Sequence, residues 1–141
     1  MTPLERVREW LKTYPGYDIL RKFQVDYTSQ IPCNGGIFPA GLVEVSRSED
    51  VCGGVEVKNQ YNFGLYYVFE KSPGDDVGAG INAEWIMDFQ EWVQNSTPPQ
   101  FGDRTISASA QNGALYSAEA EGTATYMVQL SILFERSLEN G

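Results

Sequence analysis

The feature that most constrains the fold is a two-residue alternation of side chains from Val55 to Phe69. Every odd position in this stretch is apolar except Asn59, while the even positions begin with Glu, Lys, Gln and Asn. The same period returns from Thr123 to Glu135, where the even positions from 126 to 134 are apolar. Because successive side chains of a strand point to opposite faces, the pattern predicts two long, half-buried β-strands.

Two segments have the spacing of amphipathic helices. The first opens at Thr2-Pro3, where threonine can cap free N–H groups, and Pro15-Gly16 should end it. The second is predicted from Ile81 to Gln94 and should end before Pro98-Pro99. The expected apolar stripe of the first helix is Leu4, Val7, Trp10, Leu11 and Tyr14, and that of the second is Ile81, Trp85, Ile86, Phe89, Trp92 and Val93, with Asn82 facing solvent. Such stripes are typical of helices laid across a sheet.

The remaining segments predict shorter strands and irregular connections. Strands are expected at Tyr17–Thr28, Leu42–Arg47, Thr105–Ala110 and Ala114–Ala120. The last two should be joined by a tight hairpin turn at Gln111-Asn112-Gly113, since Asn-Gly favours such turns. Glycine and proline are so dense from Ser29 to Gly41 that we expect an irregular connection there. Leu42–Arg47 and the long strand after it should form a hairpin with an acidic tip at Ser48-Glu49-Asp50.

Together these elements predict an α+β fold, an antiparallel β-sheet with an N-terminal helix and one main amphipathic helix packed on it. A chain of 141 residues, 42% of them hydrophobic, has the usual size and composition of a single domain spanning 1–141. No run approaches the roughly 18 apolar residues needed to cross a bilayer, and the first residues lack the pattern of a signal peptide. We therefore expect a cytosolic protein.

The charge balance and the absence of histidine narrow the possible functions. Ten Lys and Arg against nineteen Asp and Glu give a formal net charge of -9, and such a surface repels phosphates. Ordinary nucleic-acid binding is therefore disfavoured. Cys33 and Cys52 lack both the spacing of a metal site and histidine partners. In a reducing compartment we expect them to be free thiols. The opposing interpretation is a disulfide between them.

No pattern in the sequence predicts catalysis or an obligatory cofactor. The common nucleotide-binding, nucleophile and zinc-protease motifs do not occur. Gly78-Ala79-Gly80 lacks the lysine of a phosphate-binding loop, and Asp75-Asp76 lacks the spaced acids of a calcium loop. The carboxylate pairs Glu49/Asp50 and Glu119/Glu121 are most simply solvated surface. We therefore expect no metal, no cofactor and no enzymatic activity.

A family resemblance is carried by the main helix and the segment that follows it. The run Asn82–Gln94, followed by Phe101-Gly102-Asp103, resembles small proteins from the tail-assembly gene clusters of phages and prophages of Gram-positive bacteria, which are often labelled minor capsid proteins. Supporting segments are Leu11–Pro15, Gly36–Leu42, Tyr67–Lys71 and Ala110–Gly113. The predicted order of elements is similar to that of tail terminators, which form a ring, typically hexameric, at the head-proximal end of the tail tube.

This resemblance implies a structural virion-assembly protein consisting of a single tail-terminator-like domain, either a tail terminator or a tail-completion (head–tail joining) subunit. Its expected partners are further copies of itself in a ring and the tail-tube and head-completion proteins. It would act in the host bacterial cytoplasm during assembly and then in the virion. The acidic hairpin tip and the loop Ser72–Gly80 are expected at subunit contacts or at the ring opening, with the candidate interface residues Glu44, Arg47, Glu49, Asp50, Asp75 and Asp76.

A second interpretation remains open from the residues themselves. Aromatic side chains such as Trp85 and Tyr66 could line a groove of a non-catalytic module that binds a small molecule or a peptide. An enzyme is the third and least favoured interpretation.

Overall fold

The computed structural model describes residues 2–20, 22–26, 33–70, 76–119 and 122–139 of the chain. These residues form a five-stranded β-sheet, two α-helices and a short 3-10 helix. The elements in chain order are α1 (Pro3–Leu11), the 3-10 helix Pro15–Ile19, β1 (Lys22–Val25), β2 (Asn34–Glu49), β3 (Gly54–Glu70), α2 (Asp76–Asn95), β4 (Arg104–Glu119) and β5 (Thr123–Glu139). The predicted α+β class is confirmed.

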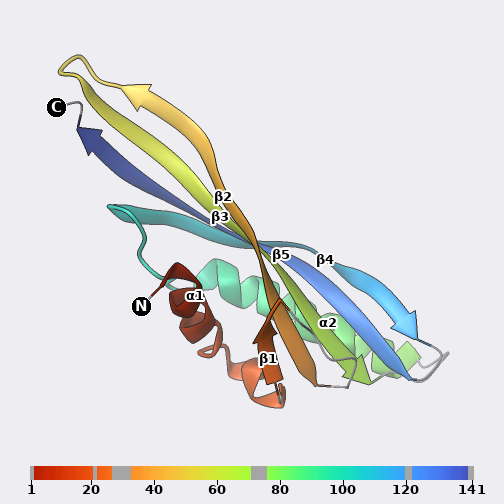
Figure 1. Cartoon of the computed structure of the whole chain (residues 1–141). Coiled ribbons are helices and arrows are strands. Elements are labelled where there is room, and N and C mark those ends of the chain that lie inside the picture. Colours follow the sequence, from red (N-terminus) through yellow and green to blue (C-terminus); the bar gives the residue numbers. More distant parts are fainter. Residues whose placement is uncertain (1, 21, 27–32, 71–75, 120–121, 140–141) are drawn as a thin grey trace.

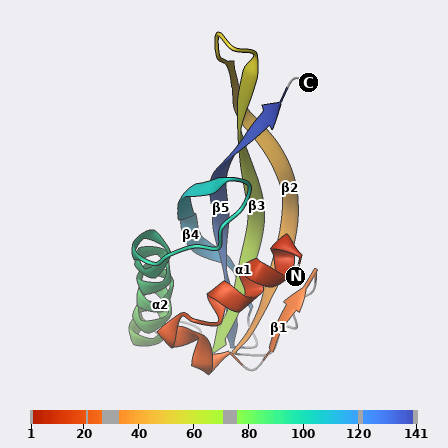
Figure 2. The ribbon, with the colours of Figure 1, turned by 90° about the vertical axis from the view of Figure 1, so that its left-hand side faces the viewer.

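The strands lie side by side in the order β1-β2-β3-β5-β4. Each neighbouring pair is antiparallel except β1 and β2, which are parallel. Both helices lie below the sheet in Figure 1, and the side view in Figure 2 shows α2 beside β4 and α1 across the lower part of the strands. The other face of the sheet carries no helix in the described part of the chain.

The two long strands predicted from the alternation are confirmed. β3 and β5 pair without a register shift from Gly54 opposite Glu139 to Glu70 opposite Thr123. Directly paired residues share a face of a sheet, so the odd positions of β3 and the even positions of β5 form one apolar surface. That surface faces the helices and contains the fully buried residues Leu65, Val128, Leu130 and Ile132.

Helix α2 lies on this apolar surface, as predicted. Ile86, Phe89 and Val93 are buried, and Trp85 and Trp92 are partly buried against the same core. The Phe89 ring packs at 5.6 Å from the ring of Tyr67 on β3 and at 5.4 Å from that of Tyr14, which follows α1. This aromatic cluster joins both helical segments to the sheet.

The phase of the α2 stripe differs from the prediction at its first turns. Ile81, expected in the stripe, is 63% exposed, whereas Asn82, expected to face solvent, is buried. The Asn82 Nδ2 donates a hydrogen bond to the backbone oxygen of Glu70 at 3.2 Å, so the buried amide is satisfied. Positions 82, 86, 89 and 93 have the same helical spacing as the predicted set, and the contact with the end of β3 selects between them.

The N-terminal helix is confirmed, although it is shorter than predicted. The Thr2 hydroxyl accepts a hydrogen bond from the Glu5 backbone N–H at 3.2 Å, and the buried positions include Val7, Trp10 and Leu11. The helix ends at Leu11, and Pro15-Gly16 open the 3-10 helix. The strand predicted from Tyr17 to Thr28 is therefore reduced to β1, because Pro15–Ile19 is helical and Asp26 has a positive φ of 55°. Residues 27 and 28 lie outside the described part.

The irregular connection predicted for Ser29–Gly41 is wrong for the described residues from 34 onward, which begin β2. Gly35 serves close packing rather than a turn, because a Cβ there would lie 2.9 Å from the Phe23 ring. Gly41, with φ of 93°, lies where the pairing with β3 shifts register between Pro39 and Leu42. The breakers therefore bend a long strand, as β-bulges do, instead of ending it.

The tight hairpin predicted at Gln111-Asn112-Gly113 is also wrong. β4 is one strand that pairs with β5 on both sides of this tripeptide, with a register shift between Gln111 and Ala114. Asn112 has φ of 57°, the left-handed conformation that an Asn-Gly turn uses, but here it forms a bulge. The local preference of the dipeptide is satisfied without a reversal of the chain.

The predicted β2–β3 hairpin is confirmed, and its end projects as an arm beyond the helices (Figures 1 and 2). We use "arm" for the distal part of β2 and β3, residues 42–58, together with the end of β5.

At the other end of β3, α2 begins at Asp76, so residues 76–80 of the predicted acidic loop are helical. The rest of that loop, residues 72–75, lies outside the described residues. None of the described helices is both long and apolar enough to cross a membrane.

Candidate interaction surfaces

The arm carries four of the six predicted interface residues. Glu44 and Arg47 lie on the distal part of β2 and form an ion pair, with the guanidinium Nη2 2.6 Å from the Glu44 Oε1. The hydrogen bonds that Glu44 accepts raise the pKa of Arg47 above its ordinary value. Both side chains are about half exposed, at 51% and 47%, as is usual for a surface pair. Glu49, also exposed, is the last residue of β2.

Asp50 has a structural role at the tip of the arm. Its Oδ1 accepts hydrogen bonds from the backbone N–H groups of Cys52 at 2.9 Å and Gly54 at 2.8 Å. A Cβ at Gly54 would lie 2.6 Å from the Asp50 Oδ2, so glycine lets the carboxylate approach the backbone. The Asp50 carboxylate therefore holds the turn, and its contact with a partner stays a prediction.

Of the two remaining predicted interface residues, the structure describes only Asp76, which lies at the opposite end of the sheet. Asp75 is outside the described residues, and Asp76 is the first residue of α2. The start of α2 is attached to the end of β3 through the Asn82–Glu70 hydrogen bond, whereas the arm tip precedes the start of β3. Figure 1 shows these two places at the two ends of the long strands. The arm tip and the described start of α2 therefore do not form one continuous surface within a subunit.

The two cysteines are free thiols. Cys33 directly precedes β2 and Cys52 lies in the turn that follows it, so the 16 residues of the strand separate them, roughly 50 Å at about 3.3 Å per residue. Cys33 is half-buried and Cys52 is exposed. The disulfide interpretation is therefore wrong for the folded chain.

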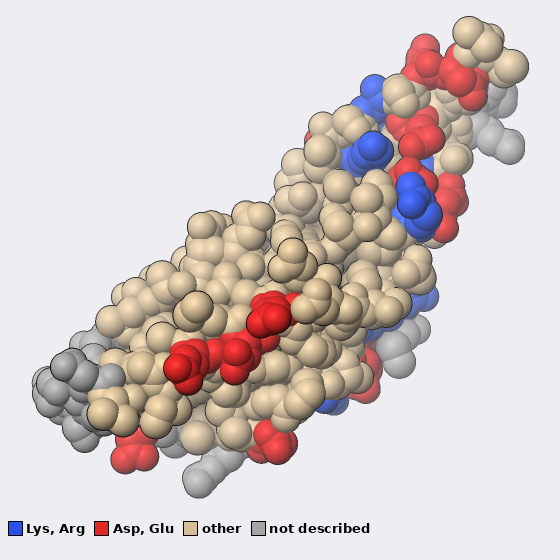
Figure 3. Space-filling model, turned by 180° about the vertical axis from the view of Figure 1, so that it is seen from behind, with Lys and Arg blue, Asp and Glu red and all other residues tan. Residues whose placement is uncertain are grey.

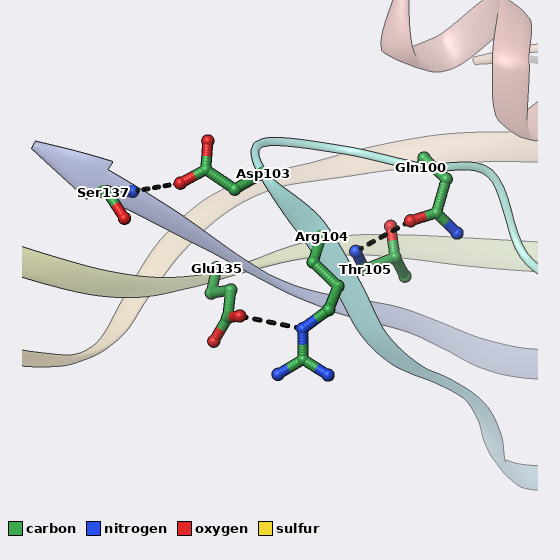
Figure 4. Close-up of polar contacts among 6 residues, drawn as sticks. All are labelled: Gln100, Asp103, Arg104, Thr105, Glu135 and Ser137. Carbon is green, nitrogen blue, oxygen red and sulfur yellow. Dashed lines mark hydrogen bonds and ion pairs between the residues drawn. The ribbon is translucent and has the colours of Figure 1, made fainter.

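The base of the arm is held by side chains from the segment that leads into β4 (Figure 4). The Arg104 Nε lies 2.8 Å from the Glu135 Oε1, and the Ser137 backbone N–H donates to the Asp103 Oδ2 at 2.7 Å. The Asp103 N–H in turn donates to the Glu135 backbone oxygen at 2.9 Å. A further bond joins the Thr105 N–H to the Gln100 Oε1 at 3.2 Å. These contacts tie the end of β5 to the body.

Replacing Arg104 with glutamine is expected to change the titration of Glu135. Hydrogen bonding from Arg104 is the main cause that holds the pKa of Glu135 below its ordinary value. This contribution to stability is present at neutral pH and is lost as the pH falls through that lowered pKa. In Arg104→Gln the Glu135 pKa, measured by NMR titration of its side-chain carboxyl carbon, should rise toward the ordinary value. An unchanged Glu135 pKa in the variant would contradict the assignment.

The helix-free face of the sheet contains a groove of about 700 Å³. Its aromatic lining includes Phe38, Tyr66 and Tyr116, and the Tyr66 ring meets the other two edge to face at 5.1 and 5.3 Å. Asn62 and Gln129 supply amide groups, and none of the lining residues is charged. The sequence contains a signal for this groove, because the even positions of β3 change from polar residues to Gly64, Tyr66 and Val68 after Asn62.

The structure separates the two aromatic residues of the binding-module interpretation. Tyr66 lines the helix-free groove, whereas Trp85 packs in the core on the other face, 4.8 Å from the Tyr67 ring between centroids. The Trp85 Nε1 donates to the Gly16 backbone oxygen at 3.2 Å, so its polar atom is used within the fold. Trp85 is therefore not part of any groove that Tyr66 lines.

A second groove, of about 800 Å³, lies between α2 and the outer edge of β4. Met87, Gln90, Glu91 and Gln94 form its helical wall, and residues 105–111 form its strand wall. No pattern in the sequence predicted it, since the groove depends on the position of α2 beside β4. Among the described residues, no cluster of three or more metal-ligating side chains occurs.

Comparison with known proteins gives no independent assignment. Neither a scan against models of protein families nor a search of curated proteins finds a match to this chain.

Proposed function

We propose that the protein is a structural subunit of a phage or prophage tail or head–tail joint, either a tail terminator or a tail-completion subunit, without catalytic activity. The observation that carries the proposal is the projecting arm. β1 pairs with β2 only from Asn34 to Ile37, so the outer edge of β2 from residue 38 to 49 has no strand neighbour within the described part of the chain. Open edges of this kind are sites of contact between chains.

Apolar side chains on the arm support a contact surface. Leu42, Val43 and Val45 are 54%, 49% and 53% exposed, and Val51 at the tip is fully exposed. A monomer gains nothing from placing these side chains in water, whereas burial in a neighbouring subunit is favourable. In a ring such as a hexamer, the arm of one subunit would contact the next subunit or the tail-tube and head-completion proteins.

The acidic character of the surface is consistent with a ring through which DNA passes. The net charge is -9, and Figure 3 shows acidic side chains both along the body and on the projecting end. Like charge prevents the phosphates from adhering to the wall of a channel. Under this proposal the subunit acts in the host bacterial cytoplasm during assembly and then in the virion.

The test is complementation in the parent phage or prophage. Deletion of the gene should give tails of abnormal length or tails that fail to join heads, seen by electron microscopy. Leu42→Glu with Val45→Glu should fail to restore infectious particles, because both side chains are exposed and the subunit should still fold. The control is Ile81→Glu, an exposed apolar position on α2, which should complement. Normal, infectious particles from the deletion strain would eliminate the proposal.

The uncharged aromatic groove favours a second candidate function, a non-catalytic module that binds a small molecule or peptide. Here Tyr116→Ala, at a 63% exposed side chain that lines the groove, would remove ligand binding and leave particle assembly unchanged. Loss of assembly in this variant together with an empty groove would instead favour the structural function.

A further inference from the structure

We propose that the groove between α2 and β4 is a docking site for one extended, positively charged segment of a partner protein, which adds to β4 as a further strand. This inference concerns a surface remote from the arm tip and does not depend on the role in tail assembly.

The backbone of β4 directs some of its hydrogen-bonding groups toward this groove. Alternate residues of an antiparallel strand direct their N–H and C=O groups to one neighbour or to the other side. The Ala110 carbonyl accepts a hydrogen bond from the Gln90 Nε2 of α2 at 3.0 Å, so Ala110 faces away from β5. Ala108, two residues earlier and without an intervening register shift, faces the same way. β5 is the one strand that pairs with β4 among the described residues.

The Gln90 side chain occupies the place that a neighbouring strand would take. Its amide N–H is bonded to an edge carbonyl just as the backbone N–H of an added strand would be. The amide is at the end of a flexible side chain, which an incoming strand could displace. Gln94, one turn further along α2, also lines the groove and offers a second amide.

The edge of β4 carries no charged side chain or proline along most of its length, although three register shifts interrupt its pairing with β5. From Thr105 to Ala118 it contains no Asp, Glu, Lys, Arg or Pro, although the chain as a whole is strongly charged. Natural edge strands commonly carry such residues to prevent pairing with other chains. The distal edge of β2 does carry them, at Glu44, Arg47 and Glu49. Of the two edges without an outer strand in the described part of the chain, β4 is therefore the uncharged one.

The charge of the helical wall indicates the chemistry of the occupant. α2 contains acidic residues and no Lys or Arg, and Glu91 is the charged residue that lines the groove. Glu91 is exposed at this wall, whereas Glu84 and Asp88 are exposed on α2 outside the groove lining. Met87, 65% exposed at the same wall, offers an apolar contact. The fitting segment therefore alternates apolar side chains with Lys or Arg.

The experiment uses the full chain and two fluorescent eight-residue peptides, measured by fluorescence anisotropy. One alternates valine with lysine or threonine, and the other has glutamate in place of each lysine. The lysine peptide should bind at least about 10-fold more tightly than the glutamate peptide. Ala108→Pro should weaken the lysine peptide about 10-fold or more, because the missing N–H faces the groove and no bond to β5 is lost.

A second variant keeps the proposal testable if Ala108→Pro does not fold. Glu91→Lys should weaken the lysine peptide about 5-fold to 10-fold, as expected for reversal of one exposed charge. The matched control is Glu84→Lys, which makes the same change on the same helix outside the groove and should leave binding within about 2-fold.

Three outcomes would overturn the proposal. The first is the absence of lysine-peptide binding to the unaltered protein. The second is equal weakening by Glu91→Lys and Glu84→Lys, which would indicate unspecific attraction to an acidic protein. The third is self-association of the protein, by analytical ultracentrifugation, that Ala108→Pro abolishes and the peptide does not displace, because the edge would then belong to a second copy of this chain.

Discussion

Replacing Phe89 with alanine is expected to lower the free energy of unfolding by about 3–5 kcal/mol. Phe89 is 1% exposed, and its ring contacts the aromatic rings of Tyr14 at 5.4 Å, Tyr67 at 5.6 Å and Trp85 at 6.1 Å. Truncation would leave a cavity where α2, the segment after α1 and β3 meet. Rigid neighbours on three elements cannot all move to fill it, so the loss should lie in the upper part of the range for core positions.

The measurement is urea unfolding followed by circular dichroism, with Met87→Ala as the control. Met87 lies on the same helix but is 65% exposed, so its truncation should change the free energy of unfolding by no more than about 0.5 kcal/mol. Similar losses for the two variants would mean that α2 does not pack on the sheet through the stripe that contains Phe89.

Replacing Gly102 with alanine should also be strongly destabilising, by about 2–4 kcal/mol. Gly102 has φ of 58°, and a Cβ there would lie 2.5 Å from the Glu135 backbone oxygen and 2.9 Å from the Phe134 ring. The clash involves backbone, which cannot turn aside as a side chain can. The segment would have to move away from β5, and the hydrogen bond from the Asp103 N–H to Glu135 would be lost with it.

Gly41→Ala separates the clash from the backbone conformation. Gly41 also has a positive φ, 93°, but a Cβ there would meet no atom within 4 Å. The free energy of unfolding of this variant should therefore fall by about 1 kcal/mol, the cost of placing alanine in a backbone conformation that favours glycine. If thermal and urea unfolding show equal losses for Gly41→Ala and Gly102→Ala, the close approach to Glu135 does not contribute to stability.

The long strands and the helices could be predicted from the sequence because their apolar side chains recur with the period of a strand or a helix. The alternation around Phe63 and Leu130 predicts a strand with one buried face. In the pairing of β3 with β5 these two residues lie opposite each other on that face. The α2 stripe was ambiguous by one residue, since helical spacing permits either Ile81 or Asn82 in the core. The hydrogen bond from Asn82 to Glu70 places Asn82, not Ile81, in the core, and the helical spacing of the sequence does not predict this bond.

The irregular features could not be predicted, because glycine and asparagine have several uses. Gly35 admits the Phe23 ring and Gly41 lies at a bulge, yet both look like loop residues in the sequence. Asn112 adopts the conformation of a turn inside a continuous strand. The parallel pairing of β1 with β2 could not be predicted either, because it depends on tertiary packing and no local sequence pattern specifies it.

The candidate surfaces were predicted in part. The exposure of the charged arm residues Glu44, Arg47 and Glu49 could be predicted because polar residues near a hairpin tip face solvent, while their contact with a partner stays a prediction. The structural use of Asp50 was missed, although an aspartate four residues before Gly54 is the available signal. The groove beside β4 depends on where α2 lies across the sheet, and a pattern in one segment does not contain that information.

The sheet order has a consequence for how the chain is made. β5 follows the other strands in the sequence but lies between β3 and β4 in the sheet. Until residues 123–139 have been synthesised, β4 therefore has no strand to pair with, and β3 has β2 alone. The pairing of β3 with β5 joins segments that are remote in the sequence, and such contacts are slow to form. A nascent chain that stops before β5 therefore cannot complete its sheet, because β5 is the strand that links β4 to β3.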